Sequence, residues 1–191
     1  TLSIDPGVTI EFQGTYKLNV QGRLLAIGAV ADTIVFTAAD INDGWSGIRF
    51  DNTPASNDSS KIQYCKLMYR TDKPVGDNKG GAVFFNYFSK VVISNSRISN
   101  CKGEFDGGGI SINYSNPRIV QNIISGNTLI ALSRGAGIYI FNSKPTIAYN
   151  AISNNTSEFG AGIFTIGSTP TISNNTISNN RLHDNQRGIR I

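Results

Sequence analysis

Charged residues are scarce in this chain of 191 residues, of which they make up 16%, well below the usual quarter. An amphipathic helix needs a charged outer face, so the shortage argues against a helical protein. The sequence also lacks any apolar run of about 18 residues, the length that a transmembrane helix needs. We therefore expect neither a helical bundle nor membrane insertion.

Cysteine and clustered positive charge are also lacking. The two cysteines, Cys65 and Cys101, fit the spacing of neither a metal site nor a disulfide-rich scaffold, so we expect both to be small buried side chains. The net charge is +4, but the basic residues are scattered along the sequence and form no stripe. Nucleic acid is therefore not an expected partner.

Asparagine, serine, threonine, isoleucine and glycine take the place of charges, a mixture that favours short strands and turns. The sequence also repeats: PTIAYNAISNN begins at Pro145 and PTISNNTISNN at Pro170, an offset of 25 residues. Weaker copies precede them, each with an isoleucine and a second apolar residue five positions later. The first members of these pairs, at steps of 31, 26, 28 and 25 residues, are Ile62, Ile93, Ile119, Ile147 and Ile172.

A second motif recurs with the same period. It is a small residue followed by an inward, outward, inward triplet, as in WSGIRF at Trp45, GGGISI at Gly107 and GAGIYI at Gly135. Two short strands per repeat, with no helical stretch between them, predict a parallel β-solenoid. We expect one all-β domain over residues 1–191 with about seven coils, regular in 45–191 and irregular in the capping coils of 1–44.

Stacking in a solenoid explains the asparagines. Equivalent residues of successive coils lie about 4.8 Å apart, and a stacked amide can supply a donor and an acceptor to the backbone of a buried turn. These asparagines are therefore expected to be structural rather than catalytic. The column in question is Cys65, Ser96, Asn122, Asn150 and Asn175.

Two sets of segments carry a family resemblance. NNTISNN…RGIRI and YNAISNN…GAGIF resemble the right-handed parallel β-helix repeat of the pectate-lyase-like superfamily. PGVTIEF, GRLLAIG, TIVFTA and WSGIRF resemble the start of β-helix domains in secreted, multidomain bacterial surface proteins. The resemblance implies a right-handed β-helix, a secreted or cell-surface location, and flanking domains in a longer parent chain. The resemblance does not indicate any one activity, because the superfamily includes lyases, hydrolases, epimerases and adhesins.

The catalytic patterns of the superfamily are mostly missing. The chain has no Asp-Asp pair and no Gly-His-Gly motif, which polygalacturonase-like hydrolases carry. Asp106, Arg134 and Glu158 nevertheless fall on three consecutive coils, where they could neutralise a uronate and abstract a proton. The alternative is that these loops hold ordinary solvated charges.

No cofactor is expected, although calcium stays possible. Two pairs of acidic residues could contribute to a calcium site, Asp40 with Asp43 and Glu104 with Asp106. Neither pair belongs to a complete loop of oxygen ligands.

The outer face of the second strand column is rich in aromatic residues. Carbohydrate-binding members of the superfamily use such a face, where rings stack on sugars and amides bind hydroxyls. Alternatively, the rings stack on one another and stabilise the sheet, or a flanking domain covers them. The expected outward residues are Arg49, Phe84, Ser111, Tyr139, Phe164 and Arg190, with Tyr87, Tyr114 and Phe141 just after the strands.

We therefore expect a carbohydrate-associated module without activity of its own, with a polysaccharide or cell-surface glycan as its partner. One alternative is a polysaccharide lyase or glycoside hydrolase of the pectate-lyase-like group, with Asp106, Arg134 and Glu158 as catalytic residues. The other is a purely structural stalk or adhesin segment. The expected ligand-binding residues are Arg49, Phe84, Tyr87, Tyr114, Tyr139, Phe141 and Phe164.

Overall fold

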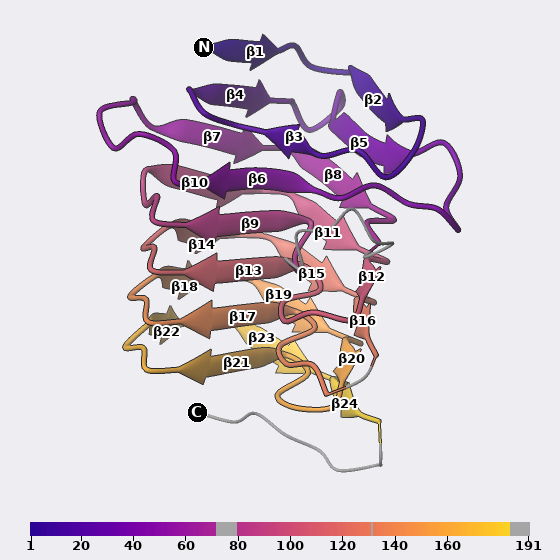
Figure 1. Cartoon of the computed structure of the whole chain (residues 1–191), viewed down its shortest axis with the longest axis vertical. Helices are drawn as coiled ribbons and strands as arrows, with labels where there is room; N and C mark the ends of the chain where they lie inside the picture. The colour runs from indigo at the N-terminus through magenta and orange to yellow at the C-terminus, as the bar shows by residue number, and fades with distance from the viewer. Residues whose placement is uncertain (72–79, 131, 184–191) are drawn as a thin grey trace.

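A computed structural model describes residues 1–71, 80–130 and 132–183, which stack as successive coils from the N-terminus down to the last strand (Figure 1). Over these ranges the chain forms strands and turns and no helix. It follows that none of the described residues forms a helix able to cross a membrane.

The strands form three long parallel sheets and one short one, which run along the stack. The third sheet forms the front layer in Figure 1, and the first and second sheets lie behind it. The first sheet consists of β1 (Leu2–Ile4), β4 (Leu24–Ile27), β7 (Ser60–Gln63), β10 (Val91–Ser94), β14 (Arg118–Val120), β18 (Thr146–Ala148) and β22 (Thr171–Ser173). The second consists of β2 (Thr9–Phe12), β5 (Ile34–Ala38), β8 (Cys65–Met68), β11 (Arg97–Ser99), β15 (Ile123–Ser125), β19 (Ala151–Ser153) and β23 (Thr176–Ser178).

The third sheet completes each coil. It consists of β3 (Leu18–Asn19), β6 (Ile48–Asp51), β9 (Val83–Asn86), β13 (Ile110–Asn113), β17 (Ile138–Phe141) and β21 (Ile163–Ile166). In the later coils a fourth, short sheet lies between the second and third, made of β12 (Lys102–Gly103), β16 (Thr128–Leu129), β20 (Thr156–Ser157) and β24 (Arg181–Leu182). The described residues thus make six full coils and most of a seventh, as the repeat predicted.

The register between coils follows the sequence alignment. Ile93 pairs with Ile62 on one side and Ile119 on the other in the first sheet. In the second sheet Ile98 likewise pairs with Leu67 and Ile124. The predicted parallel β-solenoid is confirmed.

The prediction of two strands per repeat is wrong, because each coil has three main strands. The two apolar residues of a repeat, five positions apart, lie on different sheets with a corner between them. A residue with left-handed backbone bends the chain at each such corner, for example Asn95 (φ 51°) and Asn174 (φ 54°). Asparagine tolerates this conformation better than most residues, so the asparagine-rich repeats supply corners as well as ladders.

The predicted asparagine ladder follows the corner between the first and second sheets. The backbone NH of Asn122 donates to Oδ1 of Asn150 at 2.9 Å, and that of Asn150 donates to Oδ1 of Asn175 at 2.8 Å. In return, Nδ2 of Asn150 donates to the carbonyl of Ile119 at 2.9 Å. Each side chain therefore satisfies buried backbone groups of the neighbouring coil.

Two further ladders stand at the other corners. Asn127, Asn155 and Asn180 repeat the asparagine arrangement after the second sheet, with NH to Oδ1 distances of 3.1 and 3.0 Å. After the third sheet, the NH of Ser115 donates to Oγ of Ser143 at 3.0 Å. All three corners of a coil are therefore tied to the next coil by side-chain oxygens.

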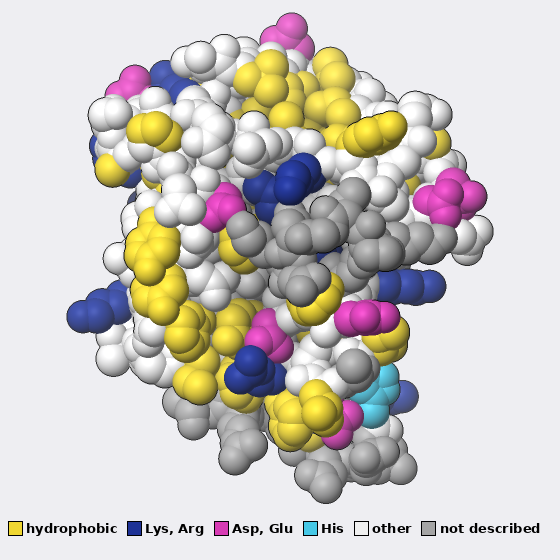
Figure 2. All heavy atoms as spheres, in the orientation of Figure 1, with side chains coloured by type: hydrophobic (Ala, Val, Ile, Leu, Met, Phe, Trp, Pro, Cys, Tyr) yellow, Lys and Arg dark blue, Asp and Glu magenta, His cyan; other side chains and the backbone are white. Residues whose placement is uncertain are grey.

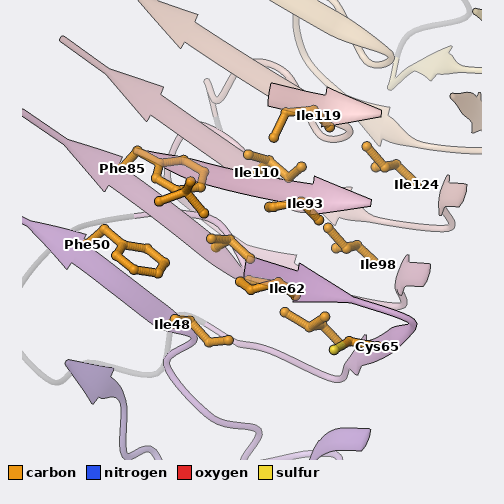
Figure 3. Close-up of a cluster of buried hydrophobic side chains, with 14 of the residues drawn as sticks. Ile48, Phe50, Ile62, Cys65, Phe85, Ile93, Ile98, Ile110, Ile119 and Ile124 are labelled. Atoms are coloured by element: carbon orange, nitrogen blue, oxygen red, sulfur yellow. The ribbon is translucent and has the colours of Figure 1, made fainter. Parts of the chain in front are cut away.

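The core between the sheets is a set of stacked apolar columns, in which isoleucine lies above isoleucine and Phe85 lies near Phe50 (Figure 3). The ring centroids of Phe50 and Phe85 are 5.5 Å apart. Cys65 and Cys101 are buried and form no disulfide, as predicted. Burial raises the pKa of the Cys65 thiol to about 12, which keeps it protonated and unreactive.

Replacing one ladder asparagine should destabilise the whole stack. In Asn150→Ala the NH of Asn122 and the carbonyl of Ile119 lose their buried partners. We expect the free energy of unfolding to fall by about 2 to 3 kcal/mol. Chemical denaturation followed by circular dichroism measures the change.

Asn19→Ala provides the control, because Asn19 is exposed in β3. Its replacement should change the free energy of unfolding by less than about 0.5 kcal/mol. Equal effects of the two substitutions would contradict a structural role for the ladder.

Candidate functional site

The outer face of the third sheet carries the predicted ligand-binding column in the predicted register. Ser111 pairs with Phe84 on one side and Tyr139 on the other, and Phe84 and Tyr139 pair with Arg49 and Phe164 respectively. The flanking residues Ile110 and Ile112 point into the core. Strand alternation therefore directs this column outward. Arg190 lies outside the described residues.

The expected exposure of this column is wrong. Phe84, Tyr139 and Phe164 are only 6%, 6% and 8% exposed. The guanidinium of Arg134 covers two of them, with its Cζ 5.4 Å from the ring centroids of both Tyr139 and Phe164. Arg49 lies over Phe84 in the same way, at 5.5 Å. These rings form a covered layer, and they do not present an open platform.

The aromatic residues of the predicted ligand-binding set that are exposed lie at the next corner. Tyr87 and Tyr114 are 56% and 42% exposed, and their rings stack in parallel with centroids 4.6 Å apart. Phe141 meets Tyr114 edge to face at 5.3 Å. Hydrophobic side chains accordingly gather over the carboxyl ends of β9, β13 and β17 (Figure 2). Rings that stack on each other turn their edges outward, so this group makes a poor surface for stacking a sugar.

The outward column is interrupted at one position. Ser111 is a small residue between the rings of Phe84 and Tyr139, and a pocket of about 190 Å³ lies over it. The Nδ2 atom of Asn113 donates to the Ser111 hydroxyl at 3.2 Å. The residues that line the pocket are Gly80, Phe84, Phe105, Asp106, Ser111, Asn113 and Tyr139.

Two of the three candidate catalytic residues, Asp106 and Arg134, lie together at the edge of this pocket. The Arg134 Nη2 atom donates to Oδ2 of Asp106 at 2.6 Å, and Nε donates to Oδ1 at 3.1 Å. Oδ1 also accepts the backbone NH of Arg134 at 2.7 Å. The hydrogen bond to Asp106 raises the pKa of Arg134 above its ordinary value. Both carboxylate oxygens of Asp106 thus accept hydrogen bonds from the same guanidinium group.

Tyr139 completes the polar side of the pocket. Burial raises the pKa of its phenol above the ordinary value, and the negative charge of Asp106 adds to the effect. At neutral pH the phenol is therefore protonated and can donate a hydrogen bond.

Glu158 does not join this pair. Arg134 pairs across the coils with Phe159, so Glu158 falls one position away from the column of Asp106 and Arg134. Nothing in the described ranges offers its carboxylate an ion pair or a hydrogen bond. Its catalytic role, like those of Asp106 and Arg134, stays a prediction.

The two possible calcium positions gain no support from neighbouring ligands. Within residues 1–71, 80–130 and 132–183, no three His, Cys, Asp or Glu side chains lie close enough together to hold a metal ion. At Asp40, Oδ1 instead accepts the backbone NH of Asn42 at 2.8 Å.

The sequence also matches a known family. The profile described as "right handed beta helix region" matches residues 31–191, which is most of the chain. The chain belongs to this β-helix family. Comparisons with curated proteins and with solved structures found no match. Family membership confirms the right-handed fold class, and it names no ligand or reaction for this β-helix.

Sequence reasoning missed Phe105 as a pocket residue, and it included Ser111 in the outward column without recognising a gap. The signal for that gap was available: Ser111 is the one small residue among large ones in the described part of the column. Phe105 lies on a loop, where no repeat fixes its position.

The pair of Asp106 and Arg134 should contribute modestly to stability, because both side chains are partly exposed. A double-mutant cycle with Asp106→Ala and Arg134→Ala should give a coupling energy of about 1 kcal/mol. Thermal or chemical denaturation of the four proteins measures it. Arg118→Ala, an exposed arginine on the first sheet, is the control for losing one charge. A coupling energy near zero would show that the ion pair does not hold this edge of the pocket.

Proposed function

We propose that this β-helix is a carbohydrate-binding module without catalytic activity of its own, and that the pocket over Ser111 takes one sugar ring. The observation that carries the proposal is the gap in the aromatic column. The rings of Phe84 and Tyr139 stand on either side of a serine, in the register of neighbouring strands.

The spacing of the gap suits an inserted ring. Phe84 and Tyr139 are two strands apart, so their strands lie about 9.6 Å from each other. A ring midway between them would lie about 4.8 Å from each, a normal stacking distance. In this protein, Tyr139 and Phe164 on adjacent strands stack at 6.0 Å. The apolar faces of a pyranose can stack on rings at such distances.

The size of the pocket limits the ligand. Its volume of about 190 Å³ is below the roughly 300 Å³ at which sites for drug-sized ligands begin. This supports one monosaccharide unit, such as a chain end or a branch, rather than several consecutive sugars.

The polar groups of the pocket support hydroxyl recognition. The Asn113 amide and the Tyr139 phenol line the pocket with the Asp106 carboxylate, and each can hydrogen-bond a sugar hydroxyl. The carboxylate is already held by Arg134, so it is oriented as an acceptor. A lyase would instead need a free base beside a free cation, and this arrangement favours binding over reaction.

We further propose a secreted or surface-attached parent protein with flanking domains. The resemblance of the repeats to those of bacterial surface proteins supports this location. The two buried cysteines form no disulfide, which is compatible with this location and does not require it.

Ser111→Phe tests the pocket directly. The new ring should fill the gap and stack with Phe84 and Tyr139, so the fold and its stability should be retained while sugar binding is lost. Saturation-transfer NMR with a panel of neutral monosaccharides and uronic acids, together with affinity electrophoresis in polysaccharide gels, measures binding. We expect the wild type to bind at least one sugar with a dissociation constant of about millimolar order.

Ser125→Phe is the matched control, because Ser125 lies in the second sheet, away from the pocket. It should leave sugar binding unchanged. The proposal would be refuted by a Ser111→Phe protein that binds as well as the wild type. If the wild-type protein bound none of the sugars in the panel, the result would favour the alternative of a purely structural stalk.

A further inference from the structure

Acidic and basic side chains lie on different sides of this β-helix. Residues 60–71, 89–103, 114–130, 143–157 and 168–182 form the first, second and fourth sheets and their corners from β7 onward, and they contain no aspartate or glutamate. The acidic residues that the structure describes in these coils all lie in the loops that lead into the third sheet. They are Glu104, Asp106 and Glu158.

Basic residues that looked scattered in the sequence gather on the acid-free side. Six of them are exposed on four successive coils of the first and second sheets or at the edge of the first. We call this group the cationic face. It consists of Lys61, Lys66, Lys90, Arg97, Arg118 and Lys144.

The register places two of these charges directly opposite each other. Lys66 pairs with Arg97 on neighbouring strands of the second sheet, an arrangement in which like charges repel. In the first sheet Lys61 and Arg118 share one column, with Val92 between them. Asp58, the acid closest in sequence to Lys61, interacts instead with Arg23 at 3.9 Å.

No acid among the described residues neutralises the paired Lys66 and Arg97. A cationic surface without internal counter-ions attracts polyanions. Because the solenoid repeats about every 4.8 Å, the charges of the cationic face extend along its axis, as a surface for an extended polymer requires.

We propose that the cationic face binds an anionic polysaccharide, a polymer that carries carboxylate or sulfate groups. Surfaces for single-stranded nucleic acid add aromatic rings on which successive bases stack. Here the outward neighbours of the cations are aliphatic or hydroxyl-bearing, such as Val92, Ile123 and Thr146. Tyr149 is exposed at the nearby corner, but no second described ring stacks on it. The chemistry therefore favours sugar acids over bases.

This surface is separate from the pocket over Ser111. The pocket lies on the third sheet, whereas the cationic face lies on the first and second sheets. In Figure 1 these two sheets lie behind the third. The inference goes beyond the proposed sugar pocket and does not depend on it. Ser111→Phe should leave binding to the cationic face intact, so failure of one site leaves the other measurable.

The test measures retardation of the protein in gels that contain polygalacturonate or a sulfated galactan. We expect both polymers to retard the wild type, and the affinity to fall at least about tenfold between about 50 mM and about 300 mM NaCl. Lys66→Gln with Arg97→Gln should weaken binding about tenfold. Because that change removes a repulsive pair, the double variant should remain as stable as the wild type.

Lys102→Gln with Arg181→Gln is the matched control, since it removes two exposed charges from the short fourth sheet. It should change the affinity less than about twofold. Three results would each overturn the proposal: equal losses in the two double variants, equal retardation by a neutral polysaccharide, or tighter binding of single-stranded DNA than of either anionic polysaccharide.

Discussion

The side-chain ladders at the corners hold this β-helix together. A parallel stack needs the chain to bend three times per coil, and each bend buries backbone groups that no strand neighbour can satisfy. The Asn150 side chain satisfies such groups: its Oδ1 accepts the NH of Asn122 and its Nδ2 donates to the carbonyl of Ile119. Ser143 likewise accepts the NH of Ser115, while its own hydroxyl donates to the carbonyl of Phe141 in the same coil. Because the ladder atoms belong to successive coils, they fix the spacing and register of everything between the corners.

That fixed register produces both of the surfaces for which we propose a role. On the third sheet it sets rings one above another, so a single serine at position 111 leaves a gap of ring size between Phe84 and Tyr139. On the second sheet it sets Lys66 opposite Arg97. In a less regular fold such side chains could move apart, whereas here the ladders hold them at strand spacing. Both proposed binding surfaces therefore depend on which residue occupies one position of a strand column, a small serine on the third sheet and basic residues on the second.

The sequence predicted the fold more fully than the site, for a physical reason. Core and corner positions repeat, so Ile93, Ile98 and Asn122 could be aligned with their partners and their stacking inferred. Loop residues do not repeat, so Glu158 was assigned to the column of Asp106 and Arg134, although Phe159 occupies it. The exposure of the outward side chains could not be predicted either. Strand alternation directs Tyr139 outward, but only the three-dimensional structure shows that Arg134 covers its ring. The number of strands was wrong because corner asparagines look like strand residues in a repeat.

Native-state hydrogen exchange of the ladder amides tests this account most directly. The backbone NH groups of Asn122, Asn150 and Asn155 have side-chain oxygens as acceptors and lie at corners outside the strands. If the ladders hold the coils together, these amides should exchange as slowly as those of the neighbouring strands, through opening of the whole stack. Exchange at nearly the rate of an unstructured peptide, while strand amides stay protected, would contradict the account.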